Sequence, residues 1–396
     1  MKNEVNIMHV LFLTDTYYPF VSGVARVIES LSTALNKQGI RTTIVCPSPS
    51  LTVTSYVSGT SQSNQLYNLP SARLLKVYDS FRFPVKPPVV LELVKEDDTV
   101  ISVHSPFFST AGAVMTAMKV KERRNIEIPI VSTFHTNIDL FSQKLVPSYF
   151  PRSPTHFLIY LMKKLLNRTL FTTVPSSSVE ESLHNKGIER ILTVPHPLTY
   201  EIFHSPTISL SSVYPFLDSG KYFLTLGRVS REKRVEYLIK AFLNLDIPLV
   251  IGGTGPHLPN LKQKYEQEPN IYFLGFVPEG HLKTLYRNAV AILSASYAET
   301  LGLSLLEGMA QKTPAIAYRK GGQTSYIEHG TNGFLYSTIK ELRNKVRTLF
   351  NNPDLQKEMG NNARTTALHY HPDNLIHEWK TVFTTALRLA KKHELY

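Results

Sequence analysis

The sequence has little of what builds disulfide-bonded, zinc-bound or membrane-spanning proteins. Its 396 residues include one cysteine, Cys46, which excludes an intrachain disulfide and a cysteine-based zinc cluster. No apolar run reaches the roughly 18 residues that a membrane-spanning helix needs. The first apolar run, His9 to Leu13, is too short for the hydrophobic region of a secretory signal. We therefore expect a cytoplasmic protein that can still bind the inner face of the cell membrane.

Acidic residues are in the minority. Against 43 Lys and Arg stand 31 Asp and Glu, which leaves a formal net charge of +12. Such a surplus favours an anionic partner: nucleic acid, acidic lipid or a phosphorylated small molecule. A nucleic-acid binder would need aromatic residues interleaved with the basic ones and a recognisable motif, and we find neither.

Short β-rich runs alternate with helical stretches along most of the chain, which predicts parallel sheets with ligands at the carboxyl ends of their strands. The expected strands are 9–14, 40–46, 99–104, 128–134, 170–174, 190–194, 222–226, 247–252, 271–274, 290–294 and 314–318. Residues 195–220 are rich in proline and serine and have the composition of a linker. We expect two Rossmann-like domains, residues 1–200 and 205–375, with a basic amphipathic helix over 376–396 packing back on the first.

Basic residues follow the expected strand that ends at Leu226. Arg228 offers a forked donor and Lys233 a point charge, a pair that suits a pyrophosphate, and Gly227 lets the backbone approach a ligand closely. The alternative is an exposed basic turn before a helix, which is how we interpret Arg231 and Arg234.

Glycines follow the next strands as well. Gly253 and Gly255 come directly after an apolar strand, and Gly322 follows a later one. They permit tight turns against a nucleotide, although ordinary strand-to-helix turns also use glycine.

Two carboxylates, Glu299 and Glu307, stand eight positions apart, a little over two helical turns. If Gly302 opens the helix, Glu299 lies in the loop before it and Glu307 on its ligand-facing side. Backbone N–H groups near Gly302 and Leu303 would then face phosphate or sugar oxygens. The alternative is one capping and one surface acid.

In this order, Gly-Arg-x4-Lys, Gly-x-Gly-Pro, Glu-x7-Glu and Gly-Gly resemble the nucleotide-sugar domain of family 4 glycosyltransferases, which are retaining enzymes. The resemblance is strong over 222–335 and looser before it. It implies an α/β chain of the GT-B fold, with two Rossmann-like doubly wound domains facing a central cleft, the first binding the acceptor and the second the nucleotide sugar. It implies catalytic roles for His135, Arg228, Lys233 and Glu299, and donor-binding roles for Gly23, Gly227, Gly253, Gly255, Gly302, Leu303, Glu307 and Gly322.

The N-terminal half supplies matching pieces. The turn that ends at Gly23 looks like the family's glycine turn after its first strand, and Thr-Phe-His135-Thr looks like its histidine motif. Val-His104-Ser-Pro-Phe107 is similar to a motif that borders the acceptor pocket, which makes His104 and Phe107 acceptor-binding candidates. A lone histidine at a strand end is otherwise more often a structural residue.

Three positions depart from the family pattern. Leu301 stands where phenylalanine is usual, and Ser325 replaces a common acid. The segment around His196 reads Pro-His-Pro-Leu where the family usually has Pro-Asn-Gly-Val.

The resemblance implies a mechanism. Arg228 and Lys233 would stabilise the charge of the leaving β-phosphate, and the acceptor would attack from the same face with that phosphate helping to remove its proton. We expect Glu299 to bind sugar hydroxyls, with a covalent nucleophile as the alternative. The chain has no Asp-x-Asp, and we expect no metal and no cofactor beyond the UDP-sugar donor.

Half of the basic surplus falls in residues 111–170, which hold nine Lys or Arg and three acids. Within them, 155–168 reads as an amphipathic helix whose polar edge carries Lys163, Lys164 and Arg168. A basic amphipathic helix suits an anionic membrane surface. The alternative is that its apolar side packs on the sheet.

The sequence therefore predicts transfer of a hexose, glucose from UDP-glucose, to a membrane lipid such as diacylglycerol, because the histidine motifs look like those of bacterial diacylglycerol glucosyltransferases. A polyprenyl-linked or cell-wall glycan acceptor is the alternative. A non-catalytic GT-B partner subunit is a further one, although such a subunit is expected to lose the motif residues that this chain retains. Oligomeric state stays open.

Overall fold

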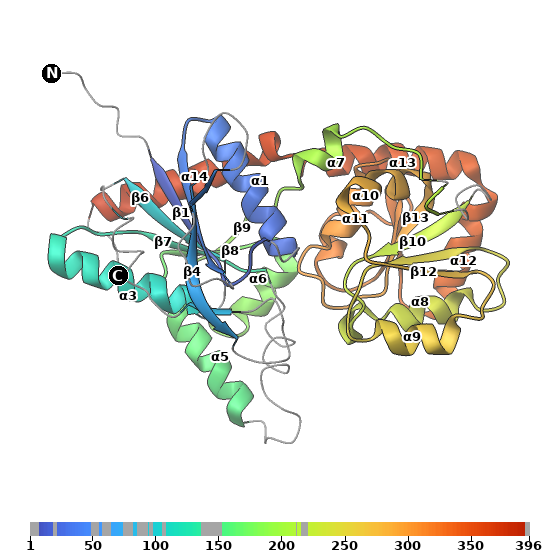
Figure 1. Cartoon of the computed structure of the whole chain (residues 1–396), viewed down its shortest axis with the longest axis horizontal. Coiled ribbons are helices and arrows are strands. Elements are labelled where there is room, and N and C mark those ends of the chain that lie inside the picture. The colour runs from blue at the N-terminus through green and yellow to red at the C-terminus, as the bar shows by residue number, and fades with distance from the viewer. Residues whose placement is uncertain are drawn as a thin grey trace. The chain divides into compact units, whose positions relative to one another are not determined.

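The chain forms two compact units. The computed structural model describes residues 8–18, 22–48, 55–57, 65–73, 82–84, 94, 98–104, 108–135, 153–210, 212–214 and 221–392 (Figure 1). The first unit comprises Met1–Pro197 and Leu375–Tyr396, and the second comprises Leu198–Asn374.

The first unit is built on a nine-stranded sheet with the order β3-β4-β2-β1-β6-β7-β8-β9, with β5 pairing to β4. The pairs of β4 with β3 and with β5 are antiparallel, and all others are parallel. Its strands are β1 (His9–Leu13), β2 (Arg41–Ser48), β3 (Ser55–Val57), β4 (Gln65–Arg73), β5 (Arg82–Pro84), β6 (Thr99–Val103), β7 (Ile130–Thr133), β8 (Phe171–Val174) and β9 (Ile191–Thr193). The continuous burial of β1, β6 and β7 is typical of parallel strands covered on both faces.

The helices of the first unit are α1 (Gly23–Lys37), α3 (Phe108–Arg124), α5 (Ser153–Leu166), α6 (Ser177–His184) and most of α14 (Pro372–Lys391). Ser22 caps α1 by accepting a hydrogen bond from the backbone N–H of Ala25 at 3.1 Å. Trp379 attaches α14 to this unit: its side chain is fully buried, and its indole N–H donates to the carbonyl oxygen of Pro195 at 3.0 Å. Lys391 adds an ion pair of 2.5 Å with Asp98.

The second unit has a six-stranded, all-parallel sheet with the order β12-β11-β10-β13-β14-β15. Its strands are β10 (Tyr222–Leu226), β11 (Leu249–Gly252), β12 (Ile271–Gly275), β13 (Ala289–Ser294), β14 (Ala315–Tyr318) and β15 (Gly333–Tyr336). Its helices are α7 (Tyr200–His204), α8 (Val235–Phe242), α9 (Leu258–Tyr265), α10 (Glu279–Asn288), α11 (Leu303–Met309), α12 (Ile339–Asn351) and α13 (Pro353–Leu368), with short 3-10 turns at η2 (Arg231–Lys233) and η3 (Gly322–Ser325).

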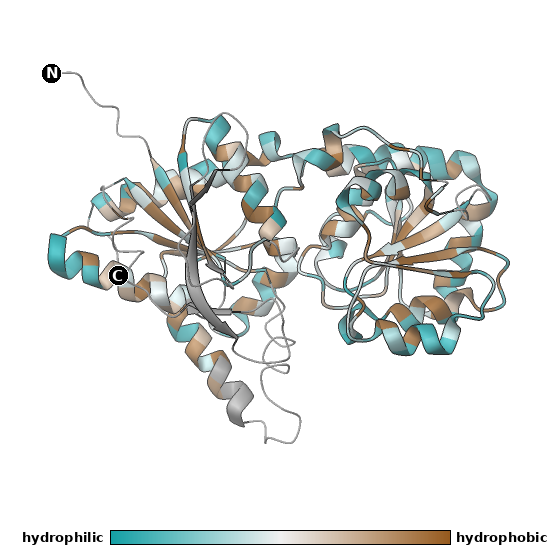
Figure 2. Ribbon diagram, in the orientation of Figure 1, coloured by the Kyte–Doolittle hydropathy of each residue, from teal (hydrophilic) through white to brown (hydrophobic). Residues whose placement is uncertain are grey.

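Side-chain alternation along β10 divides the core of the second unit into two layers. Phe223 packs with α8, α9 and α12, whereas its neighbour Leu224 packs with α10, α11 and α13. Figure 2 shows hydrophobic residues on the strands and hydrophilic ones on the outward helix faces. Each fully buried side chain of this size contributes about 1.5–3 kcal/mol to the free energy of unfolding. The doubly wound arrangement brings the carboxyl ends of β10, β11 and β13 to one edge.

The strands expected from the sequence are present, but the linker interpretation of 195–220 is wrong in part. Residues Tyr200–His204 form α7, and Ile202 and Phe203 are buried in the core of the second unit. Burial of these two apolar side chains stabilises a helix even though the surrounding segment is rich in proline and serine. Residues 211 and 215–220 lie outside the described part of the chain.

Candidate functional site

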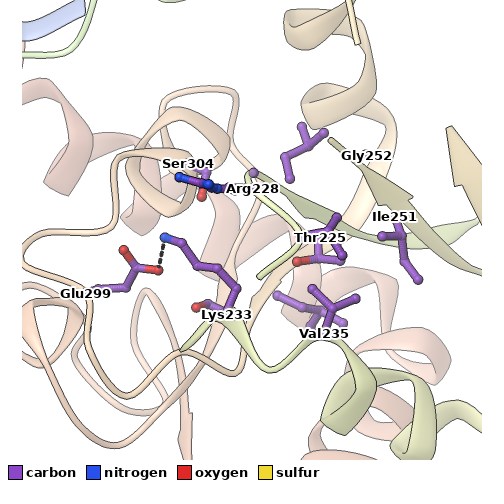
Figure 3. Close-up of a pocket in the computed structure, with 13 residues that line it drawn as sticks. Thr225, Arg228, Lys233, Val235, Ile251, Gly252, Glu299 and Ser304 are labelled. Carbon is purple, nitrogen blue, oxygen red and sulfur yellow. Dashed lines mark hydrogen bonds and ion pairs between the residues drawn. The ribbon is translucent and has the colours of Figure 1, made fainter. Parts of the chain in front are cut away.

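A pocket opens in the second unit at the carboxyl edge of its sheet (Figure 3). Arg228, Lys233 and Glu299 line it. The other lining residues are Thr225, Leu226, Gly227, Val229, Val235, Ile251, Gly252, Leu293, Ser294 and Ser304. Two cations and one carboxylate thus meet where parallel sheets of this kind bind ligands.

Lys233 and Glu299 form an ion pair within the pocket. The Lys233 Nζ lies 2.6 Å from Glu299 Oε1, with side chains 35% and 14% exposed respectively. Lys233 ends η2, and Glu299 lies in the loop after β13, whose backbone is held because the carbonyl oxygen of Glu299 accepts from the N–H of Gly322 at 2.7 Å. Both residues were predicted for the site, but their direct pairing was not.

Arg228 is exposed and lies in the turn after β10, next to the buried Val229, whose N–H donates to the carbonyl oxygen of Thr254 at 2.9 Å. Three further polar residues of the pocket, Thr225, Ser294 and Ser304, were not predicted from the sequence. Thr225 is the polar exception near the end of an apolar strand, and Ser304 lies in the first turn of α11. Both positions could have been predicted from the sequence as ligand-facing.

The glycines of the site are required by contacts within the chain. A Cβ on Gly253 would lie 1.8 Å from the carbonyl oxygen of Gly227, and one on Gly255 would lie 2.4 Å from that of Val229. The turns after β10 and β11 therefore pack directly against each other. Gly322 is similar, because a Cβ there would lie 2.0 Å from the carbonyl oxygen of Thr300. The tight turns expected at these glycines are therefore required by backbone packing, and the part of these glycines in nucleotide binding stays a prediction.

Gly302 precedes α11, as expected, and its left-handed φ of 89° favours glycine; Leu303 begins the helix and is half-buried. Glu307 is buried, with 5% of its surface exposed, and its Oε2 accepts from the hydroxyl of Tyr286 at 2.7 Å. Glu307 does not line the pocket as described, so its role in donor binding stays a prediction.

Three histidine rings form a column in the first unit, tilted to one another by 33° and 32°. The Nδ1 of His104 and the Nε2 of His135 are 2.8 Å apart, and the Nε2 of His104 is 3.1 Å from Ser102 Oγ. The ring of His196 lies 4.3 Å from that of His135, centroid to centroid, and Trp379 stacks beyond it at 6.4 Å. His104 and His135 follow β6 and β7, so the two predicted histidines meet, and His196, noted only as a family departure, joins them.

Burial keeps this column uncharged. Desolvation lowers the pKa of His135 to about 3 and holds the pKa values of His104 and His196 well below their usual range, with the neighbouring histidines adding to the effect for these two. The short contact between His104 and His135 has room for one hydrogen, which is consistent with neutral rings. His135 thus presents a neutral imidazole.

The column predicts acid sensitivity. Each of these histidines is neutral when folded and becomes protonated in the unfolded chain below about pH 6.5, so stability falls as the pH drops. Between about pH 7.5 and pH 5.5 each contributes a loss of about 1.4 kcal/mol in the free energy of unfolding. Urea unfolding of His196→Asn should therefore show a pH dependence smaller by about this amount. The control is His184→Asn on the exposed part of α6, and an equal pH dependence in both variants would contradict the assignment.

The positions of the other predicted residues of the first unit do not test their predicted roles. Gly23 is exposed at the start of α1, and Phe107 lies outside the described residues. Asp15 is buried just after β1, and its Oδ1 accepts from Ser109 Oγ at 2.5 Å.

Helices α3 and α5 contact each other and expose apolar side chains. Met115 and Met118 of α3 are 52% and 60% exposed, and Phe157 and Tyr160 of α5 are 61% and 49% exposed. Met162 of the same helix is buried in the core. The apolar side expected for this helix is therefore divided between the core and the surface.

The predicted membrane cations lie near that surface. Lys164 and Arg168 are exposed, and Lys164 Nζ lies 4.9 Å from the centroid of the Tyr160 ring. Lys163 is half-buried and its side chain lies against Gly187. None of the described helices is long and apolar enough to cross a membrane, and the described residues hold no group of three or more His, Cys, Asp or Glu side chains arranged to bind a metal ion.

Two family models match the chain, one described as Glycosyl transferases group 1 over residues 210–366 and the other as Glycosyltransferase Family 4 over residues 21–200. The chain belongs to the family 4 glycosyltransferases. The resemblance inferred from the motifs is thereby confirmed, and this glycosyltransferase carries its pocket in the half matched by the group 1 model.

Characterised relatives of this glycosyltransferase differ in what they act on. It is 27% identical to the alpha-monoglucosyldiacylglycerol synthase of Streptococcus pneumoniae over 88% of this chain and 80% of the relative. It is 22% identical to the synthase of the same name from Acholeplasma laidlawii, over 95% and 96% respectively. A GDP-mannose-dependent alpha-mannosyltransferase of Corynebacterium glutamicum is 26% identical over 84% of this chain and 77% of the relative.

Solved structures confirm the GT-B fold of this glycosyltransferase. The sucrose-phosphate synthase of Thermosynechococcus elongatus matches with a TM-score of 0.75 at 16% identity, covering 96% of this chain and 98% of the other. Anabaena HepE, solved in complex with UDP-glucose, matches with a TM-score of 0.73 at 15% identity, covering 96% and 100%.

Proposed function

We propose that this glycosyltransferase moves glucose from UDP-glucose to diacylglycerol with retention of the α configuration. The observation that carries the proposal is the pocket in which Arg228, Lys233 and Glu299 meet at the carboxyl edge of the sheet. The two named synthases act on the same lipid class, and a solved neighbour binds UDP-glucose. The second unit would hold the donor and the first the acceptor.

The pocket residues suit the departure of a nucleoside diphosphate. Arg228 and Lys233 place positive charge where the β-phosphate gains negative charge, which stabilises the transition state more than the ground state. Glu299 accepts hydrogen bonds from sugar hydroxyls and, while the donor is absent, pairs with Lys233. Thr225 and Ser304 add hydroxyl groups that can bind phosphate oxygens.

The acceptor hydroxyl would attack on the face that the phosphate leaves, and the phosphate oxygen would take its proton. No protein base is then required. His135, held neutral by burial and by the contact with His104, can donate or accept a hydrogen bond beside the sugar without adding charge. Gly302 and Leu303 would bring backbone N–H groups to the donor, and His104 would border the acceptor.

The exposed surface of α3 and α5 fits a bilayer at which a lipid acceptor resides. It combines large apolar side chains with the cations Lys164 and Arg168, the composition of a surface that binds anionic lipid. We infer a peripheral protein at the inner face of the cell membrane.

The decisive experiment supplies purified full-length protein with vesicles that contain diacylglycerol, with or without phosphatidylglycerol, and with labelled UDP-glucose, UDP-galactose, UDP-N-acetylglucosamine or GDP-mannose. We expect label in the lipid extract from UDP-glucose alone, faster on anionic vesicles, with an α-anomeric proton in the NMR spectrum of the product. Transfer only from GDP-mannose would refute the donor. Product only on a polyprenyl phosphate or a soluble glycan would refute the acceptor, and no transfer with any donor would favour a non-catalytic partner subunit.

Membrane binding by this surface is separately testable. The double substitution Met118→Ser, Phe157→Ser removes two exposed apolar anchors, so the fraction of protein that sediments with anionic vesicles should fall about tenfold. Far-UV circular dichroism should be unchanged because neither side chain is buried. The matched control Leu368→Ser changes a side chain of the second unit that is 39% exposed. Equal sedimentation of all three proteins would contradict the assignment.

A further inference from the structure

Arg234, which directly follows Lys233, has an unusual backbone conformation. Its φ of 51° and ψ of 39° lie in the left-handed region, which a residue with a Cβ rarely adopts. It ends the 3-10 turn η2 and precedes α8, and no side chain caps that helix. The intrinsic backbone preference of arginine and helix capping therefore do not explain the conformation of this turn, which carries Lys233, and contacts elsewhere in the fold must hold it.

The guanidinium of Arg234 lies among three tyrosine rings. Its Cζ is 4.4 Å from the ring centroid of Tyr237, 4.8 Å from that of Tyr318 and 5.8 Å from that of Tyr297. Behind them Tyr336 is fully buried, with its ring 5.7 Å from that of Tyr318 and 6.3 Å from that of Tyr237. Among the residues that the structure describes, none of the ion pairs with a carboxylate involves Arg234, so the cation is stabilised by the faces of the rings.

The rings that hold Arg234 come from segments that line the pocket or that support its Glu299 loop. Tyr297 lies two residues before Glu299 in the loop after β13. Tyr318 ends β14 and precedes the turn in which the N–H of Gly322 donates to the carbonyl oxygen of Glu299. Arg234 lies in a turn before α8, as expected, but its side chain is half-buried rather than exposed and reaches from the Lys233 turn to the ring of Tyr297 in the Glu299 loop.

We propose that Arg234 is a positioning residue for Lys233. Its cation, held among the rings of Tyr237, Tyr297 and Tyr318, keeps the turn left-handed, and Lys233 Nζ consequently lies in the pocket, 2.6 Å from Glu299. The inference rests on the proposed function, in which Lys233 contacts the diphosphate of the donor.

A double-mutant cycle on UDP binding tests the proposal. Arg234→Gly removes the cation without adding steric strain, because glycine adopts left-handed φ freely, but nothing then holds the turn in that conformation. In isothermal titration calorimetry we expect it to raise the Kd of UDP about tenfold. In the Lys233→Ala background the same change should alter the Kd less than about twofold, because Arg234 acts through Lys233. Where the Lys233→Ala protein binds too weakly, kcat/KM for the donor gives the same cycle.

Matched variants separate positioning from general stability. Arg231→Ala removes an exposed arginine of the same turn and should leave the Kd of UDP unchanged. Tyr318→Phe keeps the ring and should behave as the unaltered protein, whereas Tyr318→Leu should weaken UDP binding as Arg234→Gly does. Thermal unfolding of each variant reports the structural effect separately.

A crystal structure of Arg234→Gly gives a readout that does not depend on any nucleotide. We expect Lys233 Nζ to leave Glu299. An unchanged Lys233–Glu299 pair, or equal weakening of UDP binding with and without Lys233, would overturn the proposal. If the unaltered protein binds no UDP, the donor assignment fails, and the Lys233–Glu299 distance in that crystal still decides the role of Arg234.

Discussion

Replacing Lys233 by alanine is expected to lower kcat for glucosyl transfer by about two to three orders of magnitude, which corresponds to about 2.7–4 kcal/mol of lost transition-state stabilisation. The ammonium group is a point charge in a pocket that is only partly open to water, so its attraction to the leaving phosphate is weakly screened. Initial rates with labelled UDP-glucose on vesicles containing diacylglycerol measure the effect.

The substitution also leaves Glu299, which is 14% exposed, without its partner. Lys233→Arg keeps a positive charge next to Glu299. It therefore tests whether the loss of activity in Lys233→Ala comes from the unpaired carboxylate or from the loss of the lysine itself. Lys357→Ala on the exposed part of α13 is the surface control and should retain full activity. A Lys233→Ala protein that turns over at an undiminished rate would remove Lys233 from the catalytic residues.

Gly253→Ala is expected to have the second large effect. Its Cβ would lie 1.8 Å from the carbonyl oxygen of Gly227, and the φ of 121° disfavours any side chain. The turn after β11 must therefore move away from the turn that carries Arg228. We expect a loss of about 2–4 kcal/mol in the free energy of unfolding together with loss of UDP-glucose turnover.

The matched control for that substitution is Gly280→Ala near the start of α10, where φ is ordinary and a Cβ would have no atom within 4 Å. It should be neutral or stabilising by up to about 1 kcal/mol, because alanine favours helix more than glycine does. Urea unfolding followed by circular dichroism compares the two. Equal stability of both variants would show that the two turns can separate without cost.

Much of the pocket was predictable because its residues follow buried strands. Arg228, Lys233 and Glu299 were located by the rule that parallel sheets collect their carboxyl ends at one edge, and the structure brings all three into one pocket. The rule does not predict which side chains at that edge of the sheet form ion pairs with one another. The Lys233–Glu299 contact depends on backbone hydrogen bonds such as that from Gly322 to Glu299, which no local pattern reports.

Arg234 shows where sequence reasoning fails. A basic residue in a turn before a helix is usually solvated, and the three tyrosines that receive it lie 3, 63 and 84 positions further along the chain. His196 is similar: it was visible as an unusual residue in the expected linker, but its ring contact with His135 depends on how β7, β9 and α14 pack.

The sequence by itself determined the family, the α/β class, the order of strands along the chain and the residue types of the site, because these follow from hydrophobic periodicity and from short motifs of fixed spacing. Tertiary structure alone decided which glycines meet backbone, that α7 interrupts the expected linker, that Glu307 is bonded to Tyr286 and that Arg234 is held by tyrosine rings. Each of these depends on contacts between residues distant in the chain. Their distances are set by the packing of whole elements rather than by neighbours in sequence.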